Sequence, residues 1–168
     1  DIAVDGDGFF QVLRPDGAFG YTRAGAFSRE ATGLLVTPSG YAIQPEINIP
    51  PGAGNISISQ DGVVTANLPG ENTLTELGQI NIATFANPRG LTPIGENFYA
   101  STLASGEPNL GVPVQEGRGK LVQGALESSN VNVVQQLIEM IETQRAYEVS
   151  SKSITAADEM MRFISNNL

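Results

Sequence analysis

The last 44 residues of the chain, 125–168, contain neither glycine nor proline. All 19 glycines and all 10 prolines fall within residues 6–124. Glycine supplies the unusual backbone angles that turns need, and proline interrupts helices. The chain of 168 residues therefore predicts a turn-rich region at 1–124 and, at 125–168, a region in which nothing stops a helix. At this length we expect one domain with an appendage.

Residues 1–124 are typical of short strands between glycine and proline turns. The clearest hairpin is predicted over residues 55–68, where apolar and polar residues alternate on both sides of Asp61-Gly62, a favoured two-residue turn. A second alternation places Ile80 and Ile82 on one face of a strand. Turn signals recur roughly every 8–12 residues and no fixed repeat is visible. The fold class is therefore predicted to be mainly β: an antiparallel β-rich domain with turn-rich loops.

From residue 131 onward, apolar residues recur at spacings of three and four, which predicts one long C-terminal amphipathic α-helix. Its start has three candidate N-caps: Ser129, Asn130 and Asn132. The serine-rich stretch at 150–153 is the expected weak point or kink. The residues predicted to pack against other helices or subunits are Val133, Val134, Leu137, Ile138, Met140, Ile141, Gln144, Tyr147, Ile154, Met161, Ile164 and Leu168.

The predicted helix is too long for the domain that precedes it. A helix over residues 131–168 has a length of about 57 Å at about 1.5 Å per residue. A domain of residues 1–124 has an expected diameter of about 35 Å. Burial of each large apolar side chain contributes about 1.5–3 kcal/mol, and an isolated helix is only marginally stable in water. We therefore expect the apolar stripe to need a partner outside residues 1–124.

The composition excludes several classes of function. The chain has no cysteine, histidine or tryptophan and a net charge of −9. Without histidine and cysteine there is no Ser-His-Asp triad, no imidazole or thiolate metal site and no disulfide. An acidic surface without a basic stripe argues against nucleic acid and anionic membrane as partners. No apolar run is long enough for a transmembrane helix, so membrane insertion is not expected.

Three glycine-rich or acidic motifs look like functional sites but depart from the patterns that they would need. The run from Asp5 to Gly8 lacks the ligands that a calcium loop requires at its ends. The run from Gly117 to Lys120 lacks the leading glycine and the Ser/Thr of a phosphate loop. Asp158-Glu159 point about 100° apart on the predicted helix, which is typical of a solvated face. We therefore expect no metal, no cofactor and no catalytic residues.

Two groups of motifs, in this order, resemble the bacterial flagellar rod and hook axial protein family. The first group comprises VDGDGFFQV at 4–12, YTRAGAF at 21–27 and GLLVTPSGY at 33–41. The second comprises GALESSNVNVV at 124–134 and MIETQRAYE at 140–148. The resemblance extends over nearly the whole chain and is greatest to the distal-rod members of the family. The ordered pair of groups is far more specific than either group alone.

The resemblance implies a structural role without catalysis. Such subunits polymerise into a helical tube around an export channel, and the distal rod transmits torque from the motor to the hook. Expected partners are further copies of the chain, other rod and hook subunits, and the ring proteins that form a bushing around the rod. The implied location is the basal body, spanning the periplasm, after type III export without a cleaved signal peptide.

The same resemblance implies that residues 1–124 form the outer layer of the tube and residues 125–168 the inner helical layer. In this family an N-terminal helix packs with the C-terminal one. The chain begins at Asp1 without a methionine or a signal peptide. We therefore expect a fragment or processed product that lacks this helix.

Alternative functions remain open at this point. The chain could be a proximal rod or hook-type axial protein. It could instead be a secreted module whose helix docks into the groove of a partner, or a carboxylate-based hydrolase acting on cell-wall glycan. A groove binder forms a one-to-one complex, a hydrolase needs two facing acids in a cleft, and an axial subunit forms open-ended polymers.

Overall fold

The computed structural model describes residues 1–70, 73–128 and 132–166, with side chains described up to residue 162. The chain divides into two compact units, Asp1–Glu127 and Ser128–Leu168. The first, hereafter the β unit, holds all the strands, and the second holds the α-helix. Each is described by itself below.

The β unit is built from short strands, and every strand pair in its described residues is antiparallel. This confirms the predicted fold class. A short 3-10 helix, η1, covers Pro88–Gly90. The strands are β1 (Ile2–Asp5), β2 (Phe9–Leu13), β3 (Phe19–Thr22), β4 (Ser28–Arg29), β5 (Leu35–Val36), β6 (Ala42–Gln44), β7 (Gly54–Ile58), β8 (Val63–Asn67), β9 (Leu74–Gln79), β10 (Ile82–Thr84), β11 (Thr92–Gly95), β12 (Phe98–Ala100), β13 (Asn109–Gly111) and β14 (Lys120–Gln123).

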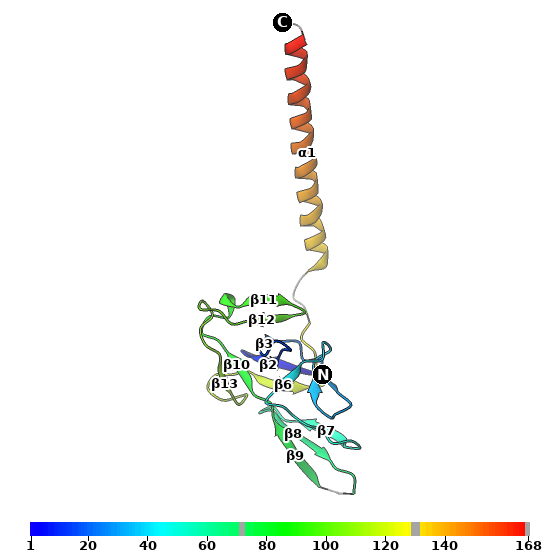
Figure 1. Cartoon of the computed structure of the whole chain (residues 1–168), viewed down its shortest axis with the longest axis vertical. Helices are drawn as coiled ribbons and strands as arrows, with labels where there is room; N and C mark the ends of the chain where they lie inside the picture. The colour runs from blue at the N-terminus through cyan, green and yellow to red at the C-terminus, as the bar shows by residue number, and fades with distance from the viewer. Residues whose placement is uncertain (71–72, 129–131, 167–168) are drawn as a thin grey trace. The chain divides into compact units, whose positions relative to one another are not determined.

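These strands form three sheets (Figure 1). The largest has the order β11-β12-β3-β2-β6-β5-β4, with β10 pairing both β2 and β13. The two others are β1-β14 and the β7-β8-β9 meander. Within the β unit, β11 and β12 lie at one end and the meander at the other (Figure 1). Strand β2 is central because it pairs on both edges, and its Phe10 and Val12 are fully buried.

Apolar side chains from all three sheets meet in one core. Both Ile80 and Ile82 are completely buried, but the single strand predicted through them is wrong. Strand β9 ends at Gln79 and β10 begins at Ile82 in a different sheet, so Ile80 lies in the link between two sheets. The core members are Ile2, Val4, Phe10, Leu35, Ile43, Ile47, Ile49, Val64, Ile80, Ile82 and Leu121. A smaller cluster gathers Tyr21, Ala83, Phe85 and Leu91. Burial raises the pKa of the Tyr21 hydroxyl, an effect opposed by the hydrogen bond that Gln11 Nε2 donates to it at 3.2 Å.

The predicted hairpin at 55–68 is formed by β7 and β8, but its turn differs from the one expected. The backbone N–H of Gly62 donates to the Ser59 carbonyl at 3.0 Å, so Gln60 and Asp61 are the central residues. Gly62 follows them with φ of 88°, the left-handed position of a three-residue loop. The carbonyl of Gly62 also accepts from the Ile80 N–H at 2.8 Å, and this distant contact favours the longer loop.

The second unit contains one α-helix in its described residues, α1 (Val133–Asn166). Asn132 is its N-cap, because Asn132 Oδ1 accepts hydrogen bonds from the backbone N–H groups of Val134 at 3.1 Å and Gln135 at 3.3 Å. The other two candidate caps, Ser129 and Asn130, lie outside the described residues. The helix assignment continues through residues 150–153 without interruption.

Candidate functional site

The predicted packing residues other than Leu168 lie along α1, and those with described side chains are exposed in this chain. The exposed fractions are 52% for Leu137, 49% for Ile141 and 77% for Tyr147. The side chain of Ile164 and the whole of Leu168 lie outside the described residues. Large apolar side chains that stay half exposed are unusual in a helix, so this face is the first candidate functional surface.

The apolar face of α1 changes width along the helix. At 100° per residue, the six apolar residues between Val133 and Ile141 span about 160° of the circumference. Beyond Ile141 one apolar column continues through Tyr147, Ile154 and Met161, seven residues apart, and Val149 and Met160 are exposed apolar residues outside it. The neighbouring heptad column becomes polar: Gln144, Ser151 and Asp158. A wide stripe suits contact with more than one neighbour, and a narrow seam suits a single helix.

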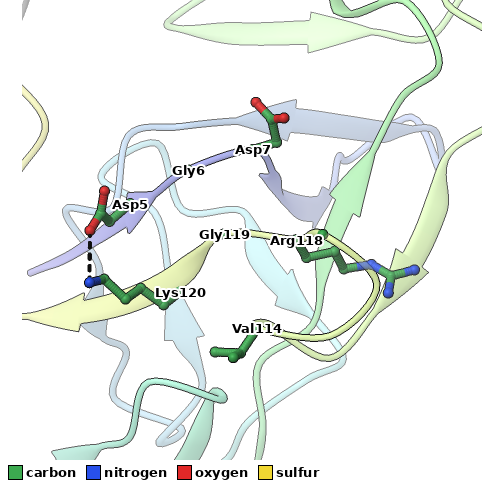
Figure 2. A pocket seen from close by; sticks show the side chains of 8 residues that line it. Asp5, Gly6, Asp7, Val114, Arg118, Gly119 and Lys120 are labelled. Atoms are coloured by element: carbon green, nitrogen blue, oxygen red, sulfur yellow. Dashed lines mark ion pairs between the residues drawn. The ribbon is translucent and has the colours of Figure 1, made fainter.

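A second candidate site lies where β1 meets β14, and it unites two motifs that are 110 residues apart in the sequence (Figure 2). Asp5 is the register partner of Lys120, and their Oδ2 and Nζ atoms are 3.1 Å apart. A Cβ added to Gly6 would lie only 2.9 Å from the Cα of Gly119. The two glycines therefore allow the chains to cross in close contact. Beside this crossing is a shallow pocket of about 410 Å³.

Several polar groups around this crossing have partners, but the buried Nε of Arg118 has none among the described residues. The N–H of Gly119 donates to the Asp7 carbonyl at 2.7 Å. Figure 2 shows the guanidinium of Arg118 directed away from the Asp5–Lys120 pair. That side chain is buried, with Nη1 2.8 Å from Glu116 Oε2 and Nη2 donating to Asn109 Oδ1 at 2.9 Å. The contacts at the crossing hold the first and last strands of the β unit, β1 and β14, against each other.

Two kinds of feature would matter in the part of the chain that the structure describes: a group of metal-binding side chains and a membrane-spanning helix. No three carboxylate, imidazole or thiol groups gather there closely enough to share a metal ion. Among the same residues, no helix combines the length and the hydropathy needed to cross a membrane.

The carboxyl group of Asp61 has a lowered pKa for a local reason. Ser59 Oγ, in the same turn, donates a hydrogen bond to Asp61 Oδ1, and this lowers the pKa of that exposed carboxyl.

Arg23 has a structural role that the sequence analysis did not identify. Its Nη1 donates to the carbonyls of Gly6 at 3.1 Å and Gly8 at 3.0 Å, and its Nη2 donates to Val4 at 3.0 Å. Its Nε donates to Glu127 Oε2 at 2.7 Å. Glu127 is the last residue of the β unit. Arg23 thus ties the loop after β1 to the segment at which the β unit ends.

Replacing Arg23 by lysine is expected to lower the free energy of unfolding of the chain by about 2 kcal/mol. A hydrogen bond from a charged donor contributes about 1.5–3 kcal/mol to stability. The single ammonium group of lysine cannot replace the guanidinium nitrogens that donate to three carbonyls. Glu127→Gln removes only a half-exposed ion pair and should cost less than about 1 kcal/mol. Urea unfolding of the two variants checks this, and equal losses would contradict the carbonyl-holding role.

Comparison with known proteins shows which protein family the chain belongs to. Residues 3–66 match the family model described as the flagellar hook protein FlgE/F/G D1 domain. Residues 122–168 match the model of the flagellar basal body rod FlgEFG protein C-terminal region. The chain belongs to this family of flagellar rod and hook axial proteins.

Within the family, the similarity to rod proteins named FlgG extends over nearly the whole chain. The chain is 49% identical to the flagellar basal-body rod protein FlgG of Buchnera aphidicola subsp. Schizaphis graminum over 98% of this chain and 64% of that protein. It is 42% identical to FlgG of Bacillus subtilis over 99% of this chain and 64% of that one. The flagellar hook protein FlgE of Caulobacter vibrioides is 42% identical over 67% of this chain and 19% of the hook protein. The chain thus spans just under two thirds of the length of these FlgG relatives.

Proposed function

We propose that this chain is part of a structural subunit of the bacterial flagellar distal rod. The main observation that supports this proposal is the exposed apolar face of α1. The chain is also 49% identical over 98% of its length to a FlgG rod protein. Side chains such as Leu137 and Ile141 are exposed on α1, and packing against another helix or another copy would bury them. The subunit would polymerise into a tube that encloses the export channel and transmits torque from motor to hook.

In this proposal the two compact units serve two layers of the tube. The β unit forms the outer layer, where lateral contacts between copies carry torsional load. Helix α1 forms the inner layer, sealed by the apolar residues predicted from the sequence. The wide apolar face at Val133–Ile141 contacts more than one neighbouring helix, and the narrower seam beyond it contacts one. Polar seam positions such as Gln144 fix the register between helices.

The proposed partners follow from the same assembly. They are further copies of this subunit, other rod and hook subunits at the ends of the tube, and the ring proteins around it. The subunit would lie in the basal body, spanning the periplasm, after type III export without a cleaved signal peptide. It would have no catalytic role, in keeping with relatives that are named as rod and hook proteins.

Electron microscopy of the whole natural protein that contains this chain tests the proposal. Purified at increasing concentration, or imaged in basal bodies of the producing cell, it should form open-ended tubes. Light scattering should show growth that continues with concentration. A stable one-to-one complex with a partner protein, and no tube at any concentration, would contradict the rod function and favour a helix-in-groove module.

A further inference from the structure

Leu103 projects from the β unit on a rigid turn. Its side chain is completely exposed, at 105% of the reference area. The turn follows β12 and is closed by its own hydroxyls: Thr102 N–H donates to Ser105 Oγ at 2.8 Å, and Ser105 Oγ lies 2.9 Å from the Thr102 carbonyl. Thr102 Oγ1 also donates to the Gly90 carbonyl at 2.6 Å. These hydrogen bonds hold the backbone of the turn that presents the exposed Leu103 side chain.

The underside of this turn is equally fixed. Asn87 Nδ2 donates to the Ala104 carbonyl at 3.1 Å. A Cβ on Gly90 would lie 2.5 Å from the Ala104 carbonyl carbon, so the two backbones are in tight contact. Turn tips usually carry glycine, asparagine, aspartate or serine, which water solvates well. A leucine presented on a preorganised turn loses little conformational entropy when it is buried by a partner.

A small hollow lies at the other end of the same β11–β12 hairpin. Its volume is about 270 Å³. This is below the ~300–1,000 Å³ that is usual for small-molecule sites, and it suits the insertion of one side chain. Ala24, Pro38 and Phe98 are the apolar residues among those that line it. Leu103 and the hollow are separated by the length of β12, Phe98–Ala100.

Five polar residues line the hollow: Thr22, Thr37, Ser39, Glu96 and Asn97. The hydroxyls of the two threonines are engaged within the chain. Thr22 Oγ1 donates to the Asn97 carbonyl at 2.9 Å and accepts from the Ala24 N–H at 3.0 Å. Thr37 Oγ1 accepts from the Tyr41 N–H at 3.2 Å. A polar ligand would find these two hydroxyls occupied, whereas an apolar side chain placed against Thr22 and Thr37 would break none of these hydrogen bonds.

The turn that closes the hairpin beside the hollow has an unusual backbone. Glu96 and Asn97 have φ of 52° and 64°, as a two-residue turn of this kind requires. Asparagine tolerates this conformation, but glutamate does so at a cost. Backbone strain of this kind is often retained where a surface has a function. Here it shapes the rim of the hollow.

We propose that Leu103 of one copy inserts into this hollow of the next copy, forming a lateral contact between β units. The inference rests on the proposed rod function and names one of its subunit contacts. The inserting residue and the hollow are different surfaces, so a head-to-tail contact leaves one of each free and continues into an open polymer. The contact is apolar, which suits copies that each carry a net charge of −9 and repel one another.

Cysteine cross-linking tests this contact directly, because the chain has no cysteine of its own. The whole natural protein would carry two substitutions, Leu103→Cys and Ser39→Cys. Ser39 is chosen because it lines the hollow and is exposed. In assembled tubes, a short bifunctional maleimide should yield a ladder of covalent oligomers. The control pair, Leu103→Cys with Gln60→Cys, uses an exposed residue in the β7–β8 turn and should yield none.

The outcomes separate this contact from the rod function. Tubes with a ladder support the contact. Tubes without a ladder, or with products that stop at the dimer, overturn the contact and leave the rod function standing. Failure of the unsubstituted protein to form tubes overturns the rod function and the contact with it.

A second variant keeps the test independent of cross-linking chemistry. Leu103→Ser should leave folding unchanged because the side chain is fully exposed, and should raise the critical concentration for assembly about tenfold or more. An unchanged critical concentration would also overturn the contact.

Discussion

Replacing Leu137 and Ile141 together by aspartate is expected to abolish tube assembly of the whole natural protein while the β unit stays folded. The two residues are one helical turn apart in the widest part of the apolar face of α1, and each is about half exposed in the single chain. In a tube they would be buried against neighbouring helices, where an unpaired carboxylate is strongly unfavourable. In the isolated subunit the aspartates remain in water and cost little.

A matched control for this pair exists on the same helix. Gln135 and Ala146 are also exposed and are not among the predicted packing residues. At 100° per residue, Gln135 lies about 160° round the helix from Leu137, and Ala146 lies about 140° from Ile141. The double substitution Gln135→Asp with Ala146→Asp therefore adds the same charge on the opposite side, about 80° or more from Tyr147 and Ile154. We expect this variant to assemble far better than the Leu137→Asp, Ile141→Asp variant.

Assembly would be measured by electron microscopy of tubes and by swimming in soft agar. Circular dichroism of the soluble subunit would check that the strand signal is retained. Normal tubes from the Leu137→Asp, Ile141→Asp variant would show that this face is not the inter-subunit surface. The main structural observation behind the rod proposal would then no longer support it.

Features of the structure that depend on neighbouring residues could be predicted from the sequence. The helix followed from its spacing and from the absence of glycine and proline, and Asn132 was among the expected caps. The alternation in the hairpin at 55–68 also located two strands correctly. The alternation at Ile80 and Ile82 indicated which residues are buried but missed the break between β9 and β10. In each case the signal lies within about one to four residues, the range over which strand and helix geometry repeat.

Contacts between distant segments could not be predicted in this way. Strand β1 pairs with β14 more than 100 residues later, and no local pattern indicates that Gly6 will cross Gly119. The same limitation explains the turn at Gly62, where a hydrogen bond from Ile80 favours a longer loop than the residue pair suggests. It also explains Arg23, whose fork is matched to three carbonyls that come together only when the loop after β1 closes.

Gly25 is a further residue whose role depends on a distant segment. The structure places it directly against the start of β1, whose Ile2 N–H donates to the Gly25 carbonyl at 2.9 Å. A Cβ at position 25 would overlap the carbonyl oxygen of Ile2 and press on the ring of Phe10. Both of those residues belong to the main core. A side chain at position 25 would therefore force β1 away from the body of the β unit.

Gly25→Ala is accordingly expected to lower the free energy of unfolding of the β unit by about 3 kcal/mol or more, the upper range for overpacking, because the obstructing atoms are backbone atoms that cannot rotate away. Gly54→Ala is the matched control: it also lies outside the left-handed region, and its added Cβ meets nothing within 4 Å. In strand β7 that change should be neutral or stabilise by up to about 1 kcal/mol, since alanine loses less entropy on folding. Urea unfolding followed by circular dichroism would compare the two midpoints. Equal midpoints would mean that β1 does not dock against Gly25 in solution.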